Sequence, residues 1–162
     1  MAENYLVEAA TRLATADAVA AVILREDGRY VLQKRDNDPR IWYPDHWGLF
    51  GGAVEEDKDL IQALRRELME ELEYDPPQWE YFFRFDFDMS FLGAVRHHRT
   101  YFIVPISIAA YGGLVLHEGA SFGAFPPEEV LGGAMKIAPY DAFALFLHHA
   151  RDRISGGPAT PA

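Results

Sequence analysis

The sequence contains no cysteine, and this absence narrows the chemistry open to the protein. Without thiols there are no disulfide bonds and no metal sites built on thiolates. A chain without cysteine also fits a reducing compartment, so we expect a cytoplasmic protein. Basic residues are few, since 15 Lys and Arg stand against 25 Asp and Glu and give a net charge of -10. That charge disfavours non-specific binding to nucleic acid and to anionic membranes.

Long apolar runs are also missing. The first residues carry two acids, Glu3 and Glu8, and polar residues interrupt the apolar stretch that follows. This start does not resemble a signal peptide. No segment stays apolar over the ~20 residues that a membrane-spanning helix needs. We therefore expect neither nucleic acid nor a membrane among the partners.

The residues that are present suit a globular protein. Of 162 residues, 49% are apolar and 14% aromatic, which is enough to bury the core of one domain. We predict an N-terminal segment over 1–16, one domain over 17–153 and a disordered tail over 154–162. No internal repeat divides the domain.

Hydrophobic periodicity and turn residues predict a mixture of strands and helices, and hence an α/β fold. Asp59 suits the start of the main helix, and "DPP" at 75–77 stops it. The predicted elements are a hairpin over 17–35, a helix over 59–73, strands over 79–91 and 99–108, a strand, loop and short strand over 112–125, a helical turn over 126–133 and a closing helix over 139–154.

The main helix holds three glutamates within five positions, at 67, 70 and 71 of "RRELMEEL". Like charges three or four residues apart cost a helix ~0.2–0.5 kcal/mol per pair. At 100° per residue, these glutamates form a stripe at the edge of the leucine face. A divalent cation bound by carboxylate oxygens would reverse the cost, and Arg66 can pair with Glu70. On the helix alone, the solvated face of an ordinary amphipathic helix explains the stripe equally well.

The run "GGAVEEDKDLIQALRRELMEELEY", residues 51–74, resembles the Nudix box, G-x5-E-x7-R-E-U-x-E-E-x-G-U, where U is a bulky aliphatic residue. Gly52 matches the opening glycine. The residues that match R-E-U-x-E-E are Arg66, Glu67, Leu68, Glu70 and Glu71. The resemblance implies the Nudix α/β/α sandwich, a mixed β-sheet with the Nudix helix and a C-terminal helix packed on it.

Two positions depart from the box. Lys58 stands where the family has a glutamate that pairs with the box arginine, a role that an acid at 55–57 can take over. Glu73 stands where the family has a second glycine. Glycine there suits a left-handed helix end, so Glu73 either adopts that conformation at ~1 kcal/mol or the helix ends differently. Neither departure removes an expected metal ligand, but both bear on how well the site works.

The resemblance implies hydrolysis of a diphosphate bond in a nucleoside diphosphate linked to another moiety, such as a nucleotide sugar or a modified nucleoside triphosphate. It implies Mg²⁺, with Mn²⁺ as the alternative, held by Glu67, Glu70, Glu71 and Glu118. Glu118 belongs to the later loop "HEGASFGAF", where a solvated acid is the alternative reading. The general base is Glu70, Glu71 or Glu118, and Arg66 supports the glutamates.

Residues outside the helix are candidates for binding the nucleotide. They are Arg35, Tyr43, Gly51, Gly52 and Arg96. The glycine pair supplies a tight turn beside the diphosphate, Arg35 can meet phosphate and Tyr43 can stack on a base. Arg96 opens "RHHR", a basic patch that either attracts the anionic ligand or forms a polar hairpin tip. An exposed strand face explains Arg35 as well, and Trp47 and Phe50 suit the core better than a ligand.

Three functions remain open at this point. The first is a Mg²⁺-dependent diphosphohydrolase acting on a small-molecule nucleotide. The second is a Nudix-fold binding or regulatory module with weak or no turnover, for which Lys58 and Glu73 speak. The third is an acidic globular domain that matches the box by chance. Nudix domains often pair, so a homodimer is one assembly that the resemblance allows.

Overall fold

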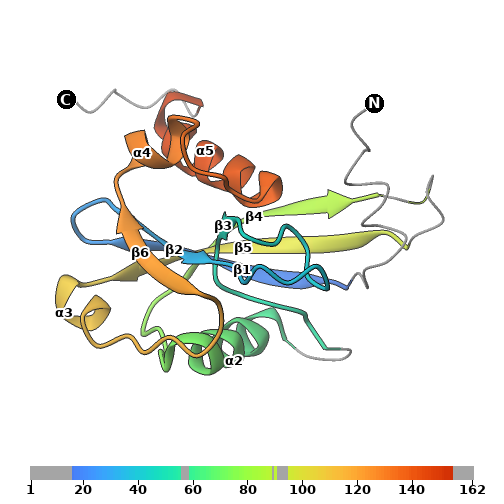
Figure 1. The fold of residues 1–162 in the computed structure, drawn as a ribbon, viewed down its shortest axis with the longest axis horizontal. Coiled ribbons are helices and arrows are strands. Elements are labelled where there is room, and N and C mark those ends of the chain that lie inside the picture. Colours follow the sequence, from blue (N-terminus) through green and yellow to red (C-terminus); the bar gives the residue numbers. More distant parts are fainter. Residues whose placement is uncertain (1–15, 56–58, 89, 91–94, 155–162) are drawn as a thin grey trace.

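The computed structural model describes residues 16–55, 59–88, 90 and 95–154 (Figure 1). The strands are β1 (Ala18–Arg25), β2 (Tyr30–Lys34), β3 (Trp47–Gly48), β4 (Glu80–Phe87), β5 (His97–Ile106) and β6 (Ser121–Phe125). The helices are α2 (Leu60–Leu72), α3 (Ile108–Tyr111), α4 (Pro127–Leu131) and α5 (Pro139–Ile154). The segments predicted at the two ends of the chain, 1–16 and 154–162, lie outside the described residues except for residues 16 and 154.

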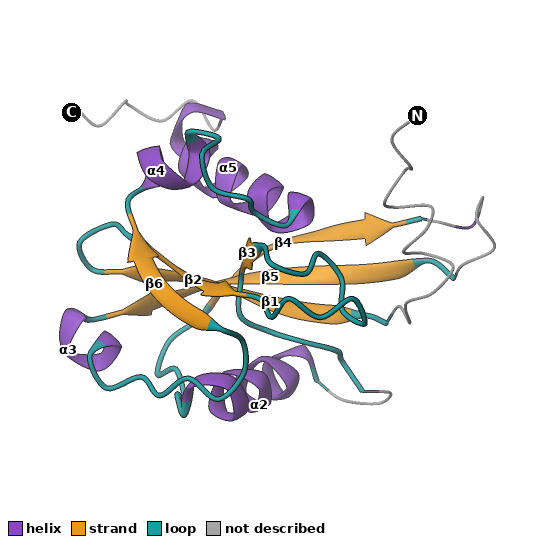
Figure 2. Cartoon of the chain, viewed as in Figure 1, coloured by secondary structure: helices purple, strands orange, loops and turns teal. Residues whose placement is uncertain are grey.

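The strands form one mixed sheet in the order β3-β2-β1-β5-β4, with β6 paired to β2. β1 and β5 run parallel, from Ala18 opposite Arg99 to Arg25 opposite Ile106, and the other pairs are antiparallel. Figure 2 shows α2 on one side of the sheet and α4 and α5 on the other. The predicted α/β sandwich with a mixed sheet is confirmed.

β1 explains why the sheet needs helices on both faces. Side chains alternate along a strand, and Val19, Ala21 and Ile23 enter the core beneath α2. Ala20 and Val22 enter the second core, beneath α5. All five are fully buried. A central strand buried on both faces reads as a continuous apolar run, as "AVAAVIL" does.

The residues at its two ends set the limits of α2. The Asp59 side chain accepts a hydrogen bond from the Ile61 backbone N–H at 2.6 Å and caps the start. At the other end Glu73 adopts the left-handed conformation, with φ of 52°. The Tyr74 N–H then reaches back to the Leu68 carbonyl at 3.2 Å. Glu73 therefore adopts the backbone expected of the missing glycine and bears its strain.

Two predictions on the second half of the chain were wrong. No strand forms at 112–116, because this segment bonds to the end of α2 instead of to the sheet: Val115 N–H donates to the Leu72 carbonyl and His117 N–H to the Glu71 carbonyl. The short helix α3 precedes it, capped by Ser107, and was not predicted. His97 and His98 belong to β5 and not to a hairpin tip. None of the described helices combines the length and apolarity needed to cross a bilayer.

Candidate functional site

The turn before α2 brings the chain close to its own backbone. Gly51 has φ of 134°, and a Cβ there would collide with the Val19 carbonyl oxygen. A Cβ on Gly52 would collide with the Glu67 carboxylate. The turn is tied to β1 by the Val19 N–H, which donates to the Gly52 carbonyl at 2.9 Å. The predicted tight turn is thus present, and its lack of side chains leaves room for a carboxylate.

Glu71 is the most buried acid of the stripe, with a side chain only 4% exposed. Its Oε2 accepts from the Gly51 N–H at 2.8 Å, and its Oε1 lies 3.4 Å from Gln33 Nε2. Burial raises the pKa of Glu71 to about 8, and the charges of Glu118 and Glu67 add to the rise. Glu71 is therefore a carboxyl group that keeps its proton near neutral pH unless a cation compensates its charge.

Glu67 and Glu118 face the same space as Glu71. All three line a cavity of about 250 Å³ together with Gly51 and Gly52. Burial also raises the pKa of Glu67, while Arg66, with its Nη2 2.7 Å from Glu67 Oε1, works against that rise. The cavity thus collects carboxylates from one helix and one distant loop.

The loop that carries Glu118 is held in place by bonds to neighbouring elements. The Glu118 carbonyl accepts from Gln33 Nε2 at 2.9 Å, and His117 Nε2 lies 2.6 Å from Glu73 Oε1. Gln33 therefore bonds both Glu71 and the Glu118 backbone. Gln33 was not predicted as a site residue, although it is a buried polar side chain on a strand of apolar neighbours. A polar residue within this mostly apolar strand is the one feature of the sequence that could have indicated a role for Gln33 in the site.

Glu70 is close enough to Glu67 to help raise its pKa, but it does not line the cavity that the other three glutamates share. Its side chain is 60% exposed, and its Oε2 is 3.4 Å from Arg66 Nη1, which is the predicted pair. It is absent from the lining of the carboxylate cavity. One helical position separates Glu70 from Glu71, and that rotation of about 100° turns its side chain outward.

Arg66 joins the glutamates to the turn. Its Nη2 donates to the Ala53 carbonyl at 2.9 Å, and its Nη1 lies 3.8 Å from Glu55 Oε1. Glu55, one of the three acids predicted to replace a glutamate at 58, thus lies within ion-pair distance of Arg66. Lys58 itself lies outside the described residues. Arg66 Nε is buried and has no hydrogen-bond partner among the described residues.

A metal site requires ligands of the right kind in the right place. Across the described part of the chain, no three His, Asp or Glu side chains stand close enough to form a finished ligand cluster. The donors are nevertheless of the kind that Mg²⁺ takes, carboxylate oxygens, and Mg²⁺ needs only one or two of them per ion. The buried, uncompensated Glu71 carboxylate meets that need, so the residues fit a divalent cation in kind and number.

A second, larger cavity opens beside the first. It measures about 480 Å³ and shares Arg35, Gly51 and Gly52 with the carboxylate cavity. Its walls are mainly aromatic, formed by Trp42, Tyr43, Phe85, Phe87, Tyr140 and Phe143. We call it the aromatic cavity. Arg35 is held at the junction of the two, because its Nε donates to the Trp42 carbonyl at 2.9 Å.

Tyr43 and Arg96, both predicted to bind substrate, lie in different surroundings. Tyr43 is almost buried in the wall of the aromatic cavity, and its φ of 49° is a strained conformation of the kind that often accompanies function. Its ring is 5.4 Å from that of Tyr140. Arg96 stands at the entrance to β5 and is not among the lining residues. Phe50 is fully buried, as predicted.

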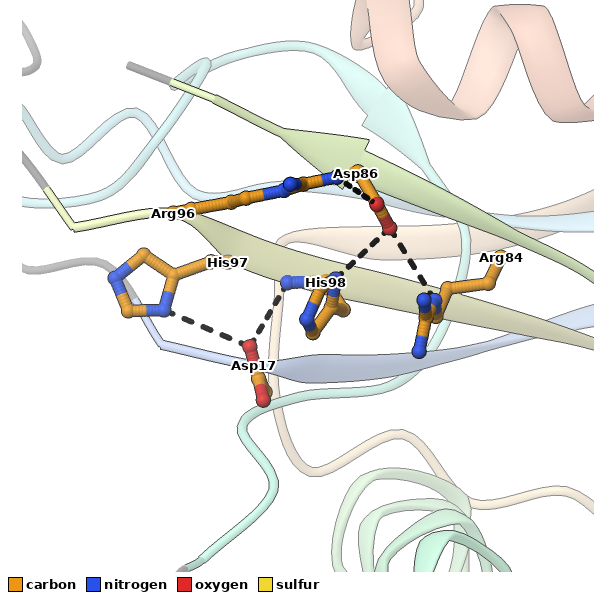
Figure 3. Close-up of polar contacts among 6 residues, drawn as sticks. All are labelled: Asp17, Arg84, Asp86, Arg96, His97 and His98. Carbon is orange, nitrogen blue, oxygen red and sulfur yellow. Dashed lines mark hydrogen bonds and ion pairs between the residues drawn. The ribbon is translucent and has the colours of Figure 1, made fainter. Parts of the chain in front are cut away.

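The rim of the aromatic cavity carries a paired network of charges (Figure 3). Asp86 on β4 bonds Arg96, forms an ion pair with Arg84 Nε at 3.2 Å and lies 2.8 Å from His98 Nδ1. Asp17 accepts the His98 backbone N–H at 2.8 Å and lies 3.6 Å from His97 Nδ1. The basic patch is thus tied to an acid on β4 and to another just before β1, which its sequence alone did not reveal.

Comparison with known proteins agrees with this geometry. The family model of the NUDIX domain matches residues 14–146. The chain belongs to the Nudix family. The Escherichia coli ORF135 protein, known from a solution structure, is 30% identical, covers 92% of this chain and 96% of its own, and has a TM-score of 0.67.

More distant structures share the Nudix fold. A MutT protein from Methanosarcina mazei is 22% identical with a TM-score of 0.69, over 85% of this chain and 94% of that one. The NUDIX domain of Shewanella oneidensis NrtR, solved with ADP ribose, is 23% identical with a TM-score of 0.64, over 87% and 89%. The nucleoside triphosphatase NudI of Escherichia coli is 39% identical over 54 residues, which is 33% of this chain and only 38% of that protein.

Proposed function

We propose that the protein hydrolyses a diphosphate bond in a nucleoside diphosphate linked to another moiety and that it uses a divalent cation, preferably Mg²⁺. The observation that carries the proposal is the buried Glu71 carboxylate, which shares a cavity with Glu67 and Glu118 beside the Gly51–Gly52 turn. Family membership supports the reaction class, since Nudix enzymes act on nucleotide-linked diphosphates and generally use a divalent metal.

Glu67, Glu71 and Glu118 would hold the cation, while Glu70 would steady Arg66 at the edge of the cavity. A bound Mg²⁺ supplies neutralisation of the diphosphate charge and a more acidic water. Of the candidates for the general base, Glu71 and Glu118 line the cavity and Glu70 does not. Arg35, which lines both cavities, would meet a phosphate oxygen at their junction.

The substrate class follows from the two cavities and from the relatives. A diphosphate fits the carboxylate cavity through its cation, and the attached nucleoside extends into the aromatic cavity, where rings can stack on the base. NudI is named as a nucleoside triphosphatase and the NrtR domain was solved with ADP ribose. Nucleoside triphosphates and nucleotide sugars are therefore the substrates to try first.

Product release from such a panel tests the proposal. Wild-type protein with Mg²⁺ is expected to release phosphate, pyrophosphate or nucleoside monophosphate, and Glu71→Gln to lower kcat/KM by roughly 100-fold or more. Glu129→Gln, which removes an exposed acid on α4, is the matched control and should leave turnover unchanged. Equal turnover in wild type and Glu71→Gln would contradict the proposal. Tight nucleotide binding without any turnover would favour the binding or regulatory module instead.

We also propose a cytoplasmic location and a homodimer. The absence of cysteine supports the first, because a reducing compartment does not call for disulfides. Light scattering on the purified protein tests the second, and a mass of one chain at micromolar concentration would contradict it.

A further inference from the structure

The aromatic cavity is lined by hydrogen-bond donors and by no acid. Among its described lining residues the permanently charged groups are Arg35 and Arg99, and neither Asp nor Glu appears. This is unusual in a chain with 25 acids and 15 Lys and Arg. A ligand group that enters this cavity therefore meets cationic donors.

Arg99 is fixed in direction by a buried acid. Its Nε and Nη2 donate to Asp141 Oδ1 at 3.3 and 3.2 Å, and its guanidinium lies 4.8 Å from the centre of the Tyr140 ring. Asp141 is fully buried, and its other oxygen accepts the Leu49 N–H at 2.9 Å. Both oxygens of Asp141 thus accept hydrogen bonds inside the protein. Asp141 orients Arg99 but is too buried to contact a ligand.

Arg99 remains accessible from the aromatic cavity. Its side chain is 13% exposed and belongs to the lining of that cavity. Burial works to lower the pKa of Arg99, but the combined effect of Asp141, Tyr101 and Tyr140 outweighs burial and raises that pKa. Arg99 is therefore a permanently charged planar donor, with nearby aromatic rings on which a base can stack.

The aromatic cavity thus combines rings that can stack on a base with a guanidinium that can donate hydrogen bonds to its edge. Together they can distinguish one base from another. We infer that Arg99 selects nucleotides whose base carries a keto oxygen at C6 of a purine or C4 of a pyrimidine, with guanine first, because guanine offers O6 and N7 side by side to a guanidinium. At the same positions adenine and cytosine carry an exocyclic amine, which would face a cation. This inference rests on the proposed function only in taking the aromatic cavity as the place where the nucleoside binds.

Binding of nucleoside monophosphates tests the inference without any need for turnover. By calorimetry, wild-type protein is expected to bind GMP at least ~10-fold more tightly than AMP, and UMP more tightly than CMP. In turnover, GTP and GDP-linked sugars should exceed ATP and ADP-linked sugars in kcat/KM by a similar factor. Equal binding of GMP and AMP, or tighter binding of ADP ribose than of a GDP-linked sugar, would overturn the inference.

A substitution separates base reading from a merely structural role. Arg99→Lys keeps a positive charge beside Asp141 but loses the planar fork, so the GMP preference should fall below ~3-fold while AMP binding changes little. Arg84→Lys, on β4 at the rim and outside the lining, is the control and should keep the full preference. Equal losses for GMP and AMP in Arg99→Lys would indicate a structural role and overturn the inference.

Base selection by Arg99 and hydrolysis of the diphosphate can fail independently of each other. A GMP preference in a protein that hydrolyses nothing would support base selection by Arg99 and contradict the proposed hydrolysis. Hydrolysis of nucleotides of all four bases at the same rate would support the proposed hydrolysis and contradict base selection by Arg99. If Arg99→Lys does not fold, as circular dichroism would reveal, the comparison of the four bases on wild-type protein still decides the inference.

Discussion

The two cavities that meet at Gly51 and Gly52 differ in chemistry and in how the chain builds them. The carboxylate cavity gathers acids, and the pKa of its most buried one, Glu71, is raised to about 8. The aromatic cavity gathers rings and a buried cation, Arg99, whose charge Asp141 already balances. The carboxylate cavity holds a negative charge, on Glu71, that no cation among the described residues balances, so it can take up a metal ion. In the aromatic cavity the charge of Arg99 is already balanced by Asp141, and the guanidinium serves as a hydrogen-bond donor. The comparison suggests where the chemistry occurs and where the substrate is chosen.

The largest expected effect is on stability against pH, and it should come from the carboxylate cavity alone. The pKa of Glu71 is about 8 in the folded protein and near 4.3 when unfolded, so between these values the folded state holds a proton that the unfolded state has lost. Stability without metal must therefore fall as pH rises from about 4.5 to about 8, by ~3–5 kcal/mol. Arg99 contributes nothing in this range, because its pKa is raised further above it.

Denaturant unfolding of wild type and Glu71→Gln, in chelator at pH 5 and pH 8.5, measures that effect. The difference between the two proteins isolates Glu71 from other titrating groups, and Glu71→Gln should be the more stable of the two at pH 8.5. Added Mg²⁺ should restore wild type but not the variant. If the free energy of unfolding changed with pH by the same amount in both proteins, Glu71 would not be the source of the effect, and the proposed difference between the two cavities would be contradicted.

The next effect concerns the wall that both cavities share. Gly51→Ala would force a Cβ against the Val19 carbonyl at φ of 134°, and it should destabilise the protein by ~3 kcal/mol or more. Gly28→Ala is the matched control, since Gly28 also has positive φ, 81°, but open space around it, and it should cost ~1 kcal/mol. Thermal denaturation compares them. Similar losses at both positions would mean that the close approach is unimportant.

Part of the carboxylate cavity could be predicted from the sequence, because two of its carboxylates, Glu67 and Glu71, lie in one helix. Periodicity located α2, and the box supplied the roles of Glu67 and Glu71. The spacing of four residues predicted the pair of Arg66 and Glu70. The pattern did not show that Glu70, predicted as a metal ligand, is absent from the lining of the cavity. Nor did it show that 112–116 would bond to the end of α2 instead of joining the sheet.

The aromatic cavity could be predicted only in part. Arg35, Tyr43, Gly51 and Gly52 were predicted to bind the nucleotide, and all four line it. Its lining comes from β1, the loop before β3, β4, β5 and the start of α5, and only strand register brings these together. Arg99 reads in the sequence as one more basic residue of "RHHR", and Asp141 as an ordinary acid in the first turn of a helix. The two residues are 42 positions apart, so only the tertiary structure shows that they pair.

The smallest effect concerns the end of α2, against which the Glu118 loop is packed. Glu73 bears a left-handed backbone with φ of 52°, so Glu73→Gly should stabilise the protein by ~1 kcal/mol. The same change removes the contact with His117, which stabilises little because both side chains are about half exposed. Chemical denaturation should give a positive change for Glu73→Gly and none for Glu73→Ala. A loss of stability in Glu73→Gly would mean that the His117 contact outweighs the strain.

The central claim is that the carboxylate cavity binds a divalent cation through Glu71. Isothermal titration of metal-free protein with Mg²⁺ or Mn²⁺ at pH 7, in two buffers of different ionisation enthalpy, tests it most directly. Because Glu71 holds a proton there, wild-type binding should release close to one proton per protein and should tighten as pH rises toward 8. Glu71→Gln should bind at least ~10-fold more weakly and release none. Equal affinity in the two proteins, with no proton released by either, would contradict the account.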